Sequence, residues 1–299
     1  MRPYRQHGQG GPRDPQAPRS APSHAGPPRG GNDGGDGESA APRPKRNADE
    51  MRLYGLNACL AMFARRPHDL RKVYLLESRM VDLKPVLAWC VQRKLGYRVV
   101  ENADLEKLTS SQHHEGVCFD VRRAPASSLA NLLQRVPRNA PALLIWLDGV
   151  GNPHNFGAVL RSAANFGVHG LLLTADSQLA LSGAALRVAE GGAESVPVAQ
   201  IRPGEDALGL LKNAEFAVAA TVPREGEALY AARLPSRLVF ILGAEGSGMR
   251  RNLIDRADLH LTIPGTGAVE SLNVAASAAV LCGEYYRQRT TAPPRRSPR

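Results

Sequence analysis

The chain has 299 residues and a mass of 32.1 kDa, with 43% hydrophobic, 22% charged and 5% aromatic residues. This length allows one large domain or two ordinary ones, and the composition is that of a globular protein, which excludes a coiled coil and a collagen. The longest apolar runs, residues 142–147 and 238–242, are too short to cross a membrane. No apolar run follows Arg2 and Arg5, so no secretory signal is expected and the predicted location is cytoplasmic.

The net charge of +10 points to a polyanionic partner, and the two ends of the chain carry most of it. Residues 1–50 contribute +2 and residues 287–299 contribute +5, which leaves +3 for the long central part. A basic tail beside a nearly balanced body favours salt-sensitive binding of RNA, but a tail that only improves solubility has the same composition. The four cysteines include no Cys-x-x-Cys pair, so we expect reduced, buried thiols and no metal site.

Residues 1–49 are a tail rich in glycine, proline and arginine. Between Met1 and Pro44 there are nine glycines and nine prolines, but no Leu, Ile, Val, Phe or Trp. Such a segment cannot bury enough apolar surface to offset its ordering entropy, so we expect it to be disordered. Residues 288–299 form a second tail, which is basic.

Residues 50–122 mix helical and strand-like patterns and predict a small α/β domain. Apolar residues at helical spacing run from Leu53 to Phe63, and a second helix is expected over residues 81–94. The side chains expected to face inward from the second helix are Val86, Leu87, Cys90 and Val91. Short strands are expected at residues 73–76, 98–101 and 116–121. The domain is too small for an elaborate active site, but its size suits a module that recognises a substrate.

A linker over residues 123–140, with a helix at 126–136, leads into a second α/β region at 141–287. Residues 142–147 are continuously apolar, which is typical of a strand buried on both faces, and a helix over 155–166 follows. Later strands are expected at 170–174, 217–220, 238–242 and 259–263, before an alanine-rich helix at 273–287. This alternation predicts a parallel sheet covered on both faces, whose ligands bind at the carboxyl ends of the strands.

Three glycine-containing segments follow predicted strands. In the first, residues 147–157, Gly149 and Gly151 allow a tight turn, and Asn155 can cap the next helix, which carries Arg161. The second, residues 243–248, reads G-x-x-G-x-G, which is not the dinucleotide fingerprint, and no Lys-Ser/Thr follows it for a P-loop. The third, residues 263–273, leads into the final helix.

Together these segments resemble the three signature motifs of the SpoU (TrmH-like) ribose 2′-O-methyltransferases of the SPOUT class. The matching stretches are N-P-x-N-x-G-x-x-x-R-x-A-x-x-F-G at 152–167, L-G-x-E-x-x-G at 242–248 and I-P-x-x-x-x-x-E-S-L-N at 263–273. Residues 192–197, Gly-Ala-Glu-Ser-Val-Pro, are similar to an intermediate stretch of the family. Residues 50–122 look like the ribosomal-protein-like substrate-binding domain of its longer members.

The resemblance implies an α/β fold in which a trefoil-knotted, parallel-sheet SPOUT catalytic domain follows the small RNA-binding domain. It also implies S-adenosylmethionine (S-adenosyl-L-methionine) as cofactor, tRNA or rRNA as substrate, and a homodimer formed through the knotted domain. The residues implied for the cofactor are Thr221, Val222, Leu242, Gly243, Ala244, Glu245, Gly246, Ile263, Pro264, Thr266, Ser271 and Leu272. The residues implied for catalysis are Arg161, Asn155, Glu245, Ser271 and Asn273.

A ribose 2′-hydroxyl is a poor nucleophile while it is protonated, so such a site must hold it in line and stabilise the developing oxyanion. The guanidinium of Arg161 stays charged and can bind the neighbouring phosphate. His154 is interpreted as a neighbour and not as the base, and His113, His114 and Cys118 lack a fourth metal ligand. The alternatives are a non-catalytic RNA-binding or ribosome-assembly factor, which does not need all five implied catalytic residues, and a nucleotide-dependent oxidoreductase, which the glycine spacing disfavours.

Overall fold

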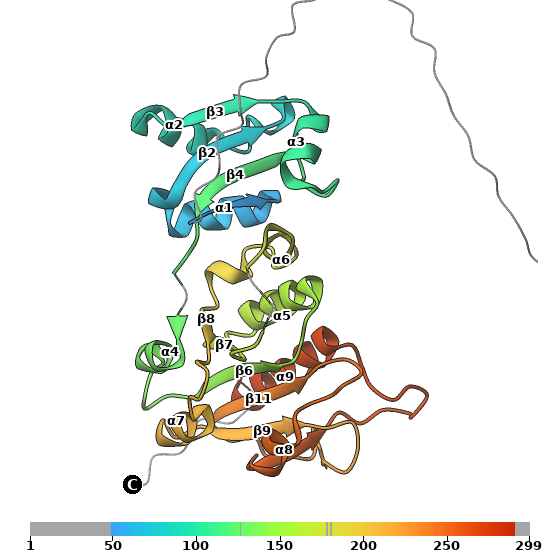
Figure 1. The fold of residues 1–299 in the computed structure, drawn as a ribbon. Coiled ribbons are helices and arrows are strands. Elements are labelled where there is room, and N and C mark those ends of the chain that lie inside the picture. Colours follow the sequence, from blue (N-terminus) through green and yellow to red (C-terminus); the bar gives the residue numbers. More distant parts are fainter. Residues whose placement is uncertain (1–48, 126, 178, 180, 291–299) are drawn as a thin grey trace, which may run out of the picture. The chain divides into compact units, whose positions relative to one another are not determined.

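The computed structural model describes residues 49–125, 127–177, 179 and 181–290 (Figure 1). The expected tails at 1–49 and 288–299 therefore lie almost entirely outside the described residues. The described residues belong to one compact unit, which contains a four-stranded and an eight-stranded sheet. In the part of the chain that is described, no helix has the length and apolar character needed to pass through a bilayer.

The four-stranded sheet has the order β1-β4-β2-β3 and belongs to the small domain. β4 pairs antiparallel with both β1 and β2, and β3 pairs parallel with β2. The strands are β1 (Glu50–Tyr54), β2 (Leu70–Leu75), β3 (Gly96–Val99) and β4 (Val117–Arg122). The helices are α1 (Leu56–Arg65), α2 (Lys84–Arg93) and α3 (Asn102–Thr109), with short 3-10 turns η1 (Pro67–Asp69) and η2 (Glu77–Arg79).

Two expectations for the small domain are wrong in detail. Leu53 belongs to β1 and not to the first helix, because its backbone pairs with Phe119 of β4 and this pairing overrides the helical spacing. Val91 was expected to face inward but is 66% exposed, whereas Val86 and Cys90 of the same helix are buried. Val86 and Cys90 are four residues apart and share a face, while Val91 lies about 100° further around the helix.

The eight-stranded sheet has the order β10-β12-β9-β11-β6-β7-β8-β5, and every neighbouring pair is parallel, as the alternation of strands and helices predicts. All seven residues of β6 are buried, which confirms the strand expected at 142–147. The strands are β5 (Ser127–Ser128), β6 (Ala142–Asp148), β7 (Gly170–Leu173), β8 (Val198–Gln200), β9 (Ala217–Thr221), β10 (Glu227–Ala228), β11 (Arg237–Gly243) and β12 (Leu259–Thr262).

Helices cover both faces of this sheet. One apolar core contains side chains of α5, α6 and α9, and the other contains side chains of α4, α7 and α8. Alternate residues of β6 enter the two cores, for example Ile145 and Trp146, because successive side chains of a strand point to opposite faces. The helices are α4 (Leu129–Arg135), α5 (Pro153–Asn165), α6 (Gly183–Val188), α7 (Ala207–Asn213), α8 (Arg251–Asp255) and α9 (Val274–Thr290).

The segment expected as a linker, residues 123–140, takes part in the large domain. Ser127 and Ser128 pair with β8 as the edge strand β5, and the Ser128 hydroxyl caps α4 by accepting the N–H of Asn131. Leu129 and Leu132 of α4 are fully buried in the core on one face of the sheet. The helix was expected, but the sequence did not show that it packs against the sheet.

The four cysteines are free and buried, as the sequence predicts. Burial raises the pKa of the Cys282 thiol to about 12, so this thiol is protonated at neutral pH. Among the residues that the structure describes, no group of three or more His, Cys, Asp or Glu side chains could hold a metal ion.

Candidate active site

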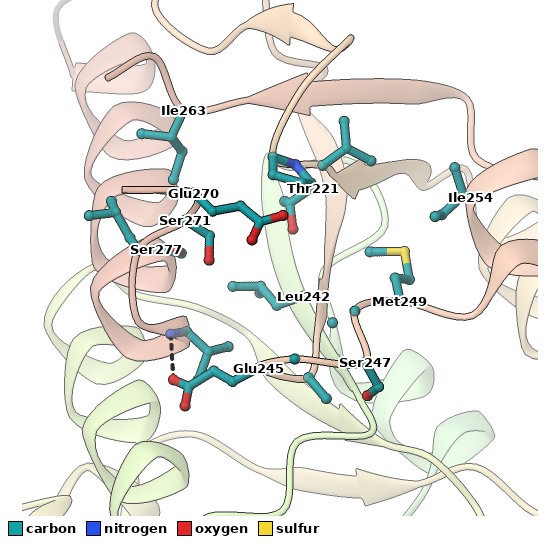
Figure 2. A pocket seen from close by; sticks show the side chains of 18 of the residues that line it. Thr221, Leu242, Glu245, Ser247, Met249, Ile254, Ile263, Glu270, Ser271 and Ser277 are labelled. Atoms are coloured by element: carbon teal, nitrogen blue, oxygen red, sulfur yellow. Dashed lines mark hydrogen bonds between the residues drawn. The ribbon is translucent and has the colours of Figure 1, made fainter. Parts of the chain in front are cut away.

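A cavity of about 380 Å³ opens at the carboxyl ends of β9, β11 and β12 (Figure 2). Its volume falls within the range of about 300–1,000 Å³ that is usual for small-molecule sites. The residues of the sequence-based cofactor set that line it are Thr221, Val222, Leu242, Gly243, Ala244, Glu245, Gly246, Ile263, Ser271 and Leu272. Pro264 and Thr266 do not line it, and the Thr266 hydroxyl instead accepts the N–H of Ala268 at 3.4 Å.

One wall of the cavity is a tight backbone turn between β11 and α8. Ala244 and Gly248 exchange two backbone hydrogen bonds, of 3.0 and 2.9 Å, and Gly246 and Gly248 have positive φ angles. A Cβ atom at Gly243 would lie 2.5 Å from the carbonyl carbon of Gly248 and from the nitrogen of Met249. Only glycine at position 243 therefore lets the turn close this tightly.

Glu245 links the turn to two helices. Its Oε1 atom accepts hydrogen bonds from the side-chain amides of Asn155, at 3.1 Å, and Asn273, at 2.8 Å, and from the backbone N–H of Val274, at 3.3 Å. The last of these is drawn dashed in Figure 2. The Asn273 amide also donates to Oδ1 of Asn155 at 3.1 Å. The structure thus joins one residue from each of the three sequence motifs in a single network.

The starts of α5 and α9 explain how the two asparagines are held. Asn152, and not Asn155 as expected, caps α5: its Oδ1 atom accepts the N–H of His154 at 2.8 Å. The Asn155 side chain is therefore available to Glu245. Asn273 caps α9 through Oδ1, which accepts the N–H of Ala275 at 2.9 Å, and its amide nitrogen remains free to donate to Glu245.

Arg161 lies outside this network. It is exposed on α5, and its guanidinium has no hydrogen bond or ion pair with any residue that the structure describes. Six residues of helix separate it from Asn155, which corresponds to about 9 Å along the axis and about 120° around it. A charged guanidinium without an internal partner can bind an external anion.

Sequence analysis assigned no role to Asp148, although this carboxylate supports the turn. Asp148 ends β6, pairs in register with Gly243, and has a side chain only 3% exposed. Its Oδ2 atom accepts the backbone N–H of Arg250, and its Oδ1 atom lies 2.8 Å from Nε of the same residue. The sequence does contain a signal for this role, because Asp148 is a carboxylate at the end of a continuously apolar strand, where an unpaired charge would be costly to bury.

Other cavity residues were also outside the predicted set. Glu270 and Ser277 line the cavity together with Met249. Glu270 extends across the cavity toward Thr221 in Figure 2. Ser277 follows Asn273 by four residues, so helical periodicity could have placed both on one face of α9.

Asp148→Asn is expected to weaken ligand binding in this cavity about tenfold. The substitution removes the charge of a buried carboxylate that accepts two hydrogen bonds, so Arg250, which follows the turn, is held less firmly. Calorimetric titration with S-adenosylmethionine, the cofactor that the sequence resemblance implies, measures the effect. Arg251→Ala is the matched control, since it removes a neighbouring pair with Asp255 whose side chains are 84% and 54% exposed. Equal affinities for the Asp148 variant and the native chain would contradict the supporting role.

Comparison with protein families gives two matches. Residues 142–283 match the SpoU rRNA Methylase family, and residues 52–126 match the family described as RNA 2'-O ribose methyltransferase substrate binding. The two matches correspond to the large and small domains of the structure. All three motifs of the site lie within the first match.

Among curated proteins, the chain is 35% identical over 247 residues to the "Uncharacterized tRNA/rRNA methyltransferase YfiF" of Escherichia coli O157:H7, covering 82% of this chain and 70% of that protein. It is 31% identical over 242 residues to the "23S rRNA (guanosine-2'-O-)-methyltransferase RlmB" of Escherichia coli K12, covering 80% of this chain and 98% of that protein.

Two solved structures show the same fold. The SpoU methyltransferase AviRb from Streptomyces viridochromogenes, in complex with AdoMet, has a TM-score of 0.68 at 19% identity and covers 82% of this chain and 92% of its own. The AdoMet-bound rRNA methyltransferase from Sinorhizobium meliloti also has a TM-score of 0.68, at 20% identity, with coverages of 82% and 89%.

Proposed function

The chain belongs to the SpoU family of RNA 2′-O-methyltransferases, and on that premise we propose that it methylates ribosomal RNA with Arg161 as the residue that activates the ribose. The family reaction transfers a methyl group from S-adenosylmethionine to a ribose 2′-hydroxyl. The proposal depends on the surroundings of Arg161, whose guanidinium has no partner among the described residues. Arg161 lies on α5, and the first turn of this helix carries Asn155, which donates to Glu245 beside the cavity.

The residues of the cavity fit the cofactor. Leu242 and Ile263 would offer an apolar surface to an adenine ring, and the glycine turn at 243–248 would supply backbone groups for its polar atoms. Glu270 and Ser271 add polar side chains to the lining. When bound, S-adenosylmethionine supplies an electrophilic methyl group on a positively charged sulfur.

The chain's own residues would orient the ribose and stabilise charge on it. Glu245 holds the amides of Asn155 and Asn273 in fixed positions, so these groups need no reorganisation when the substrate arrives. Arg161 would bind the RNA phosphate beside the target and stabilise negative charge on the 2′-oxygen as its proton passes to solvent water. The methyl group would then pass from sulfur to this oxygen, and S-adenosylhomocysteine would leave as a neutral thioether. No histidine base is required for this arrangement.

A homodimer is part of the proposal. Because Arg161 lies about 120° around α5 from Asn155, it does not share the face that contacts Glu245 in its own chain. A second chain packed against α5 and α9 could place its arginine over the first chain's cavity. We further propose that the segments forming the cavity are the trefoil knot of the SPOUT class and that the protein acts in the cytoplasm.

Ribosomal RNA is favoured as substrate by the relatives named as guanosine-2′-O-methyltransferases of 23S rRNA, almost all of whose length this chain covers. The small domain and the basic C-terminal end both suit a large folded RNA. A tRNA contains the same ribose 2′-hydroxyls and phosphates, so the experiment has to distinguish tRNA from ribosomal RNA as the substrate.

The experiment combines cofactor binding with mapping of 2′-O-methyl groups. We expect calorimetry to show one S-adenosylmethionine site per chain, and RNA from cells lacking the protein to lose one 2′-O-methylguanosine of the large-subunit RNA that the purified protein restores. Loss of a tRNA methyl group instead would reject ribosomal RNA as the substrate. Tight RNA binding without cofactor binding or transfer would instead favour the non-catalytic factor.

A further inference from the structure

The segment from α6 to η3 (Gly192–Glu194) packs against the small domain as well as against the large one. Leu186 of α6 is 4% exposed and belongs to the apolar core of the small domain, with side chains of β1, β2 and β4. A Cβ atom at Gly183 would lie 2.6 Å from the backbone oxygen of Arg52 in β1. The small domain is therefore not self-contained, because part of its core comes from the large domain.

Two adjacent glycines place this segment between α1 and α5. A Cβ atom at Gly191 would lie 2.6 Å from the Cβ atom of Ala61 in α1, and one at Gly192 would lie 2.8 Å from the backbone oxygen of Leu160 in α5. Leu160 directly precedes Arg161. A movement of α1 would therefore be transmitted through a few close contacts to the backbone that carries the arginine.

Arg66 and Glu194 form the principal ion pair across this contact. Arg66 donates from Nε and Nη2 to the carboxylate of Glu194, with distances of 2.9 Å to each oxygen, and the two side chains are 19% and 12% exposed. Arg66 also donates to the backbone oxygen of Arg122 at 2.8 Å, which ties the pair to the end of β4. Low exposure and two-point geometry distinguish this pair from ordinary surface ion pairs.

Further hydrogen bonds join the small domain to the segment from α6 to η3. The Asn57 side chain of α1 donates to the carboxylate of Glu190 at 2.6 Å, and Nε of Arg187 donates to the backbone oxygen of His113 at 2.7 Å. The stretch 192–197, singled out in the sequence, lies here and takes no part in the cavity chemistry.

We propose that the Arg66–Glu194 pair is a positioning device that holds the RNA-recognising domain at a fixed place relative to α5, and so determines which ribose reaches Arg161. This inference rests on the proposed function. Arg66 and Glu194 touch neither the cavity nor the Glu245 network, so they act through the packing of α1 on η3 and of η3 on α5.

The test uses the full chain with Glu194→Gln, which keeps the side-chain shape and removes its charge. We expect the KM for the RNA to rise about tenfold, as for loss of a charged hydrogen-bonded pair, with kcat and S-adenosylmethionine affinity changed less than about twofold. Native-state hydrogen exchange should become faster in α1, α6 and η3 and remain unchanged in β6 and β11. Asp82→Asn, which breaks an exposed pair with Arg79 inside the small domain, is the control and should change neither quantity.

A double-mutant cycle with Arg66→Gln completes the design. If Glu194 acts only through Arg66, the double variant should have the same KM as Arg66→Gln alone, which also loses the bonds of Arg66 to Arg122 and Asp69. Faster hydrogen exchange with an unaltered KM would show that the pair is purely structural and would overturn the proposal. Additive effects of the two substitutions on the KM would also overturn it. If the native protein methylates no RNA, the proposed function is refuted. The positioning role is still testable in that case, because hydrogen-exchange rates that do not change in Glu194→Gln would reject it.

Discussion

Arg161→Ala is expected to reduce methyl transfer by about 10²–10³-fold or more, because a preorganised charge that stabilises an oxyanion and positions the substrate is removed. S-adenosylmethionine affinity should change less than about twofold, since Arg161 does not line the cavity and the cofactor would be held by the turn at 243–248. Single-turnover rates on the identified RNA, with calorimetry of cofactor binding, measure the two effects separately.

Two further variants make this prediction specific. Arg161→Lys should restore only part of the rate, because an ammonium group cannot reproduce the planar fork that spans a hydroxyl and a phosphate. Arg135→Ala, which removes another exposed helical arginine from the same domain, should leave the rate unaltered. A near-native rate for Arg161→Ala would remove this residue from the mechanism.

Gly243→Ala is expected to weaken S-adenosylmethionine binding by about 10–100-fold, because overpacking of this kind costs about 1–3 kcal/mol. The added methyl group would meet backbone atoms of Gly248 and Met249 at 2.5 Å, and these cannot rotate away as a side chain could. The turn has to open, which breaks its two hydrogen bonds and reshapes the cavity wall. Calorimetric titration gives the affinity, and thermal unfolding shows whether the fold is retained.

Gly151→Ala is the matched control for this turn. Position 151 also lies in a glycine-containing motif after a strand, but its φ angle is not positive, and a methyl group added there would meet no heavy atom of the described residues within 4 Å. The control should bind S-adenosylmethionine with native affinity. If Gly243→Ala did so too, the close approach at Gly243 would not shape the cofactor site.

The motif residues could be predicted because their signals are local. A continuously apolar run followed by glycine, as at residues 142–151, identifies both a buried strand and the turn after it. Parallel strands bring such turns to one edge of a sheet, but it was the family resemblance that placed Asn155, Glu245 and Asn273 in one site, where the structure joins them by hydrogen bonds. The residue that caps α5 was not determined in this way, because Asn152 and Asn155 have the same capping chemistry.

The sequence by itself determined the parallel α/β class and the strands β6, β7, β9, β11 and β12 of the large domain, because periodicity acts over a few residues. Most of the cavity lining was implied by the family resemblance, and the strands β5, β8 and β10 were not expected. Only the tertiary structure decided that α4 packs against the sheet, that Asp148 holds Arg250 from 102 residues away, and that Arg66 meets Glu194 across 128 residues. An ion pair of this kind leaves no local pattern, since each charged residue alone looks like part of a solvated surface. Its partner is selected by how the two domains pack, and that packing depends on side-chain shapes summed over the whole compact unit.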